Sequence, residues 1–203
     1  MKRIVIALIT IIFMGGCKEH QLMVGKRNAM TMHRSDVKNF QKHEYHSRVS
    51  IKVGKNTEVE IIDMGKYWIK ISSINQSAYS LRAAFSKDGL KLIGIDTLFY
   101  DRPIGEYNKY DKSGKLVNKI NDDAAYTFTI SDVIKLIKNK YDVDLTKRKK
   151  GQIVLRHFEN GDKRTPVYNV LLPTKVDEVT YRRILIDGND GHIITDEEGE
   201  YID

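Results

Sequence analysis

In the middle of the chain the apolar residues recur at every second position, and this alternation constrains the fold more than any other feature of the sequence. Val49, Ile51 and Val53 alternate with polar residues up to the turn sequence Gly54-Lys55-Asn56, and later stretches repeat the pattern. Residues two apart on a strand share one face of a sheet, so these stretches read as half-buried strands joined by tight turns. Residues 48–124 are therefore predicted to form an antiparallel β-rich meander.

One later stretch has a helical period instead. Thr129 and Asp132 have the spacing of a capping box, and the apolar residues of 133–141 fall on one side of a helical wheel. Three further strand-like stretches follow, at 152–158, 166–172 and 179–186. We therefore expect an α+β fold: the β-rich part, then a module over 125–203 made of a helix and a three-to-four-stranded antiparallel sheet.

The first seventeen residues indicate export. Lys2-Arg3 precedes the apolar run Ile4–Met14, and Gly15-Gly16 leads into Cys17, the only cysteine. This is the order of a secretory signal, and the run is shorter than the roughly 20 residues of a membrane span. We expect 1–16 to be removed as a signal peptide. An ordinary signal, with Cys17 there by chance, or a short membrane anchor is the alternative.

These residues resemble the lipobox-type signal of bacterial lipoproteins, with Met14 where Leu is usual. The resemblance implies that Cys17 is lipidated, with diacylglycerol and further acyl chains such as palmitate, and becomes the mature N-terminus. Stable anchoring needs more than one acyl chain, which that modification supplies. Lys18 in place of the usual retention Asp implies the outer membrane, facing the periplasm, if the host is Gram-negative. The polar segment 17–47 is expected to be a tether, with room for a short helix around 36–45.

The C-terminal part resembles a PepSY-type domain, a small module of metallopeptidase propeptides and of many secreted bacterial proteins. The resemblance rests on a Ser-led helix start at 130–134, the strand Pro166-Val167-Tyr168-Asn169-Val170, and the last-strand pattern of 186–194. It covers 129–196. It implies a binding or inhibitory module without catalytic residues of its own.

Two clusters invite a metal-binding interpretation, and neither has the required spacing. His43 and His46 lack the third and fourth ligands that zinc needs, so they read as tether residues. Asp187, Asn189 and Asp190 do not match the ligand positions of a calcium loop, and Asn-Asp-Gly runs form hairpin turns. No metal site and no cofactor are predicted.

Catalytic residues are not predicted either. The chain has no G-x-S-x-G motif, and neither Gly65-Lys66 nor Gly114-Lys115 belongs to a complete phosphate-binding loop. A site that converges only in three dimensions is invisible to such motifs. An envelope enzyme therefore stays an alternative.

Trp68 is the candidate for a partner contact. It alternates with Tyr67 and Ile69, so on a strand it points to the opposite face from them. If Tyr67 faces the core, Trp68 lies on the outer face, where a large aromatic residue can anchor a partner. If both faces are covered, Trp68 belongs to the core.

The net charge of the chain indicates which classes of partner it favours. The formal net charge is +7, and removal of Lys2 and Arg3 with the signal leaves +5. Such an excess favours acidic partners or anionic headgroups, while nucleic acid does not suit an exported, membrane-anchored chain. We expect a non-catalytic binding or inhibitory module for a cell-envelope protein. The alternatives are an immunity lipoprotein that neutralises a toxin delivered to the periplasm and the envelope enzyme.

Overall fold

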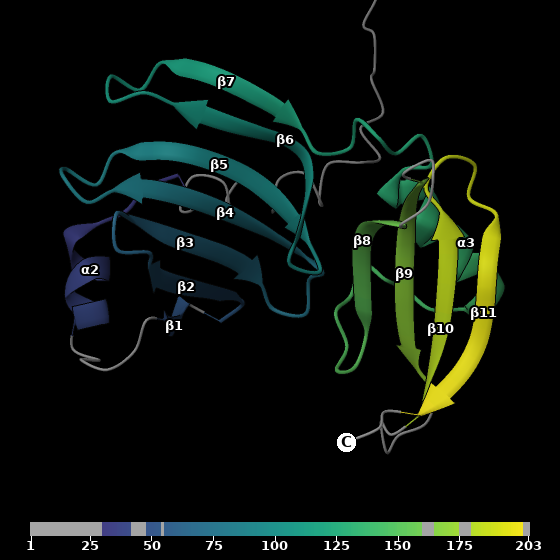
Figure 1. Ribbon diagram of the computed structural model, residues 1–203. Helices are drawn as coiled ribbons and strands as arrows, with labels where there is room; N and C mark the ends of the chain where they lie inside the picture. The colour runs from purple at the N-terminus through teal and green to yellow at the C-terminus, as the bar shows by residue number, and fades with distance from the viewer. Residues whose placement is uncertain (1–29, 42–47, 54, 160–164, 175–179, 201–203) are drawn as a thin grey trace, which may run out of the picture.

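The structure is a computed structural model, and it describes residues 30–41, 48–53, 55–159, 165–174 and 180–200. Within these residues the chain forms two antiparallel β-sheets that lie side by side, each with a helix against it (Figure 1). One helix comes first along the chain, then seven strands, a second helix and four more strands.

The first sheet is a seven-stranded meander in which each strand pairs with the next strand in sequence. The strands are β1 (Arg48–Val53), β2 (Thr57–Asp63), β3 (Tyr67–Ile74), β4 (Tyr79–Ser86), β5 (Leu92–Phe99), β6 (Arg102–Tyr110) and β7 (Leu116–Asn121). Because neighbouring strands run in opposite directions, the β2–β3, β4–β5 and β6–β7 turns lie at the same end of the sheet. The strand order agrees with the meander that the alternation predicts.

The second sheet has four strands in the order β11-β10-β9-β8 and follows the helix α3 (Ile130–Tyr141). The strands are β8 (Ile153–Glu159), β9 (Thr165–Pro173), β10 (Thr180–Asp187) and β11 (Ile193–Glu200). The predicted capping box of α3 is confirmed: the Asp132 backbone N–H donates to the Thr129 hydroxyl at 3.3 Å, and the Thr129 N–H donates to the Asp132 carboxylate at 3.2 Å. Among the described residues, neither helix is long and apolar enough to cross a membrane.

The predicted α+β class is wrong, because the described part of the chain is β-rich. It contains eleven strands against two helices of eight and twelve residues. The capping box and apolar stripe of α3 are strong local signals, but they specify one short element. The period of two extends over far more of the chain and decides the fold class.

Helix α2 (Arg34–Gln41) covers one face of the first sheet, near the end that holds the β2–β3, β4–β5 and β6–β7 turns. Phe40 packs edge-on against Trp68, with the ring centroids 5.1 Å apart, and both side chains are buried. Part of the segment expected to be a polar tether, 17–47, therefore packs on the sheet. Its helix begins two residues earlier than the expected short helix.

A buried lysine holds this segment in place. Lys70 is 5% exposed, and its Nζ donates to the Thr31 carbonyl oxygen at 2.9 Å and pairs with the Asp36 carboxylate at 3.2 Å. A charge taken out of water is tolerated only when it is paired and hydrogen-bonded. Lys70 therefore favours one position of the α2 segment over others.

The two sheets share an apolar core at their junction. Phe99 and Tyr100, at the end of β5, belong to the same buried cluster as Ile137 of α3 and Tyr168 of β9. The Tyr100 hydroxyl also donates to the Gln152 side-chain oxygen at 3.2 Å. Side chains of the first sheet thus complete the core of the second.

Arg156 of β8 adds polar contacts across the same junction. Its side chain is 6% exposed and pairs with Asp123 at 2.7 Å. It also donates to the carbonyl oxygens of Pro103 at 2.6 Å and Asp122 at 3.1 Å, and it lies 4.1 Å from the centroid of the Tyr126 ring. One buried guanidinium thus joins the second sheet to β6 and to the segment after β7.

Candidate functional site

The face of the seven-stranded sheet opposite α2, called here the open face, carries two adjoining hollows. The first has a volume of about 630 Å³ and the second about 460 Å³. Both are lined by Ile69 of β3 and Arg82 of β4, so they meet at the centre of the sheet. Pockets of this size are typical of binding sites, and two that adjoin make an extended surface.

The first residues of β3 are apolar or aromatic on both sides of the strand. Trp68, on the α2 side, is buried, whereas Ile69 and Ile71, which point the other way, are half-buried. Ile62 of β2 and Ile74 at the end of β3 also line the first hollow, which makes four isoleucines. Strict alternation of apolar and polar residues marks a sheet with one wet face, so apolar residues on both faces of one strand indicate two covered faces. Only one of those faces has a helix on it among the described residues.

A buried ion pair stands between the two hollows. The Arg82 Nε donates to one Asp96 oxygen at 3.0 Å, and a terminal nitrogen of Arg82 pairs with the other. The Asp96 side chain is 2% exposed, whereas that of Arg82 is 35% exposed. This hydrogen bonding to Asp96 raises the pKa of Arg82. The pair therefore presents the edge of a fixed guanidinium to the surface.

Two further arginines line the first hollow, each with an acidic partner. Arg48 pairs with Glu60 at 2.5 Å, and Arg148 makes two contacts with Asp101, at 3.0 Å and 2.5 Å. Burial raises the pKa of Glu60, and the hydrogen bond from Arg148 lowers the pKa of Asp101. Each arginine of this hollow thus has an acidic partner within the chain, as in the polar rim of a protein interface.

The second hollow contains an aromatic side chain packed over a glycine. A Cβ placed on Gly94 would lie 2.5 Å from the hydroxyl oxygen of Tyr107, so only glycine leaves room for the ring. Burial raises the pKa of Tyr107. Tyr67 lines the same hollow. A glycine inside a strand pattern is the sequence signal for such a close approach. Gly94 has this signal, but the sequence reasoning above did not draw on it.

The structure places Trp68 in the core. It is 5% exposed, lies beneath the Lys87 ammonium at 3.4 Å from the ring centroid, and contacts Phe40. Helix α2 covers this face of the sheet, so Trp68 does not lie on an outer face of the described part of the chain. Cys17, His43 and His46 lie outside the described residues.

The acidic group at 187–192 forms the predicted turn between β10 and β11. The Asp187 carboxylate accepts from the Asn189 N–H at 2.7 Å, and that of Asp190 accepts from the His192 N–H at 2.9 Å. The His192 ring lies 2.7 Å from the same Asp190 oxygen. Turn geometry accounts for these contacts, which agrees with the hairpin interpretation.

Among the described residues, the side chains that line the two hollows of the open face include no histidine or cysteine. The arginines there are held in ion pairs, and the aromatic and isoleucine side chains offer contact area. This arrangement can bind a surface of mixed character.

No family model matches the chain, and no curated protein or solved structure matches it significantly.

Proposed function

We propose that the chain is an exported lipoprotein, anchored in the membrane through Cys17, that binds a cell-envelope protein without catalysing a reaction. The open face of the seven-stranded sheet is the binding site. The observation that carries the proposal is the pair of adjoining hollows that meet at Ile69 and Arg82.

The composition of the open face favours a protein partner. Residues that contribute most to protein interfaces are tyrosine, arginine and tryptophan. The hollows contain Tyr67, Tyr107 and Arg82 around half-buried isoleucines. Because Arg82 is already paired with Asp96, a partner can cover it without leaving a lone buried charge.

The kind of partner follows from the PepSY resemblance of 129–196. That resemblance supports inhibition of an envelope peptidase. A toxin delivered to the periplasm is the other partner expected of a small anchored binding protein. The identity of the captured protein separates the two.

Capture from envelope extract tests the binding site. The mature chain with Cys17→Ser serves as bait, in three forms: unchanged, with Ser50→Arg and Ser80→Arg together, and with Ser35→Arg. Ser50 and Ser80 line the first hollow, whereas Ser35 is exposed on α2. A stoichiometric partner that is lost with the two hollow substitutions and kept with Ser35→Arg supports the proposal.

The opposite result, equal capture by all three forms or no stoichiometric partner, overturns the open face as the site. Thermal unfolding of each form shows that the folded state is kept.

The anchor is tested in cells. Cys17→Ser is expected to move the protein from the membrane fraction to the soluble fraction when the membranes are washed at high salt, which screens contacts between exposed charges. Continued sedimentation with the washed membranes contradicts lipidation at Cys17.

A further inference from the structure

We propose that the turn end of the seven-stranded sheet docks on the anionic phospholipid headgroups of the membrane that holds Cys17. The turn end is defined as the β2–β3, β4–β5 and β6–β7 turns with the strand ends beside them. The opposite end of the sheet contacts the second sheet through Ala78 and Tyr100. The inference rests on the lipid anchor of the proposed function and adds a second contact with the same membrane.

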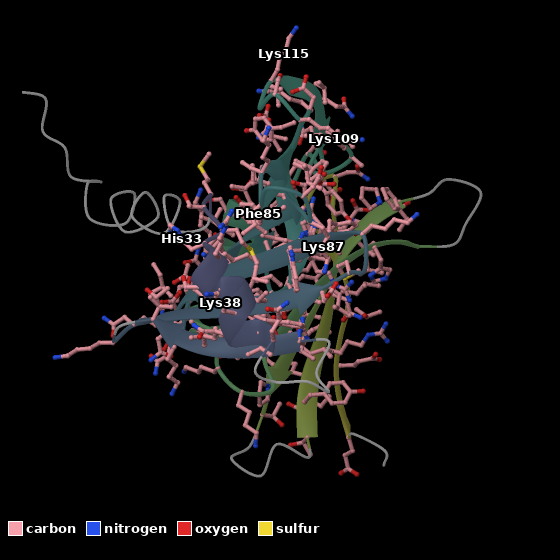
Figure 2. The ribbon with its side chains drawn as sticks, turned by 90° about the vertical axis from the view of Figure 1, so that its left-hand side faces the viewer. His33, Lys38, Phe85, Lys87, Lys109 and Lys115 are labelled. Carbon is pink, nitrogen blue, oxygen red and sulfur yellow. The ribbon has the colours of Figure 1, made fainter. Side chains whose placement is uncertain are left out.

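The three turns form one continuous surface. Lys87 of the β4–β5 turn pairs with Asp63, beside the β2–β3 turn, at 2.6 Å. Lys91 donates from its Nζ to the Lys112 carbonyl oxygen of the β6–β7 turn at 3.0 Å. Figure 2 looks onto this side of the molecule, with Lys87, Lys109 and Lys115 along it and α2 in front. The meander therefore gathers residues far apart in sequence at one end.

Cations predominate on this surface. Among the described residues of the turn end there are six lysines and three aspartates: Lys66, Lys87, Lys91, Lys109, Lys112 and Lys115, with Asp63, Asp88 and Asp111. The Asp111 carboxylate is used within its own turn, where it accepts from the N–H groups of Ser113 and Lys115. Each lysine that comes near an anionic bilayer adds to the electrostatic attraction. The excess of lysines is therefore enough for measurable binding.

Exposed apolar side chains lie between these lysines. Met64 is 47% exposed in the β2–β3 turn, and Leu116 and Val117 are 40% and 53% exposed just after the β6–β7 turn. Apolar residues flanked by lysines are the composition of surfaces that sit at the headgroup boundary.

The number of residues between Cys17 and the first described residue limits how far the anchor can lie from this end of the molecule. Met30 follows Cys17 by 13 residues, and a fully extended chain of that length spans at most about 45 Å. The chain then continues into α2, and Phe40 of α2 contacts Trp68. The Lys87 ammonium of the turn end lies over the ring of the same Trp68. With Cys17 in the bilayer, the turn end is held within reach of the headgroups.

Vesicle sedimentation tests the inference without the anchor. The mature chain with Cys17→Ser is mixed at low salt with vesicles of phosphatidylcholine alone or with added phosphatidylglycerol. We expect binding at least about tenfold stronger to the anionic vesicles, lost at high salt because exposed charges are screened. Equal binding to both vesicles, or no binding to either, overturns the inference.

Two charge-matched variants locate the surface. Lys66→Glu, Lys112→Glu and Lys115→Glu together are expected to reduce anionic vesicle binding at least about tenfold. Lys135→Glu, Lys147→Glu and Lys149→Glu together change the net charge equally on exposed lysines of α3 and the loop before β8, and they are expected to leave most of the binding. Equal loss in both variants means that net charge alone attracts the chain, and it overturns the turn end as the docking surface.

These results are separable from those of the proposed function. Lys66, Lys112 and Lys115 line neither hollow, so their substitution is expected to leave partner capture unchanged. Failure of Cys17→Ser to release the protein from membranes washed at high salt would count against the anchor alone, because the wash removes the headgroup contact.

Discussion

The two sheets differ in how much of their surface their helices cover. Helix α3 has twelve residues and is about 18 Å long, while four strands span about 14 Å from first to last. Helix α2 has eight residues and is about 12 Å long, against about 29 Å for seven strands. The smaller sheet is therefore matched to its helix, and the larger one is not.

Both sheets are closely packed on the face toward their helix: Val170 and Ile184 of the smaller sheet and Ile61 and Ala83 of the larger one are all 0% exposed. Ile69 and Ile71, on the face of the larger sheet that points away from α2, stay half-buried and line the first hollow. The larger sheet thus adds a candidate binding surface to its packed face. The shared core at Phe99 is the place where packing in one supports the other.

Phe99→Ala tests whether the two sheets depend on their shared core, and it is expected to have the largest effect on stability. Phe99 is 1% exposed, and its loss leaves a cavity that is expected to cost about 3–5 kcal/mol of unfolding free energy. Because the core is shared, both sheets should unfold in one transition. Urea unfolding can follow the whole chain by circular dichroism and the first sheet by the fluorescence of Trp68, the only tryptophan. Transitions that separate, with only one shifted, would show that the sheets fold independently.

Arg156→Met tests the polar contacts of the junction. It leaves the Asp123 carboxylate and two carbonyl oxygens without their donor and is expected to destabilise the fold by about 3 kcal/mol. Arg182→Met, which removes a solvent-accessible arginine paired with Asp196, is the control and is expected to destabilise the fold far less, because solvent screens exposed ion pairs. A similar loss of unfolding free energy in the two variants would mean that the polar contacts at the junction contribute no more than an exposed ion pair.

Asp196 gives the smaller sheet a pH dependence. The hydrogen bond from Arg182 lowers the pKa of Asp196 to about 2, and a bond from the Tyr141 hydroxyl acts in the same direction. A folded-state pKa below the unfolded value stabilises the fold above about pH 4, and that contribution is lost as the pH falls toward 2. Asp196→Asn should therefore cost about 1 kcal/mol at pH 7, a figure reduced by solvent screening, and nothing near pH 2. A pH-independent difference in urea unfolding between the two proteins would contradict this role.

The sequence predicts the local elements well because their signals are local. The period of two around Val49 and Ile51 and the capping box of Thr129 depend only on nearby residues, and both describe the elements that form. The α+β class failed because one strong helix signal was extended to the whole module. The position of Trp68 was left open because β3 begins with aromatic and apolar residues on both faces, at Tyr67, Trp68 and Ile69, and the pattern does not say which face a helix covers.

The candidate site was beyond sequence reasoning for a different reason. Arg82 and Asp96 meet across neighbouring strands, and Arg148, in the loop between α3 and β8, pairs with Asp101 after β5. Such pairs follow from strand register and from the packing of the two sheets, which no spacing in the chain specifies. Gly94 was the one local signal of the open face.

The central claim is that the open face holds the partner, and crosslinking in living cells tests it most directly. A photo-crosslinking amino acid replaces Ser80, which lines the first hollow, or Ser35, which is exposed on α2. The account predicts one dominant crosslinked protein with the probe at position 80 and none with the probe at position 35. The same crosslinked protein from position 35 and none from position 80 would contradict it.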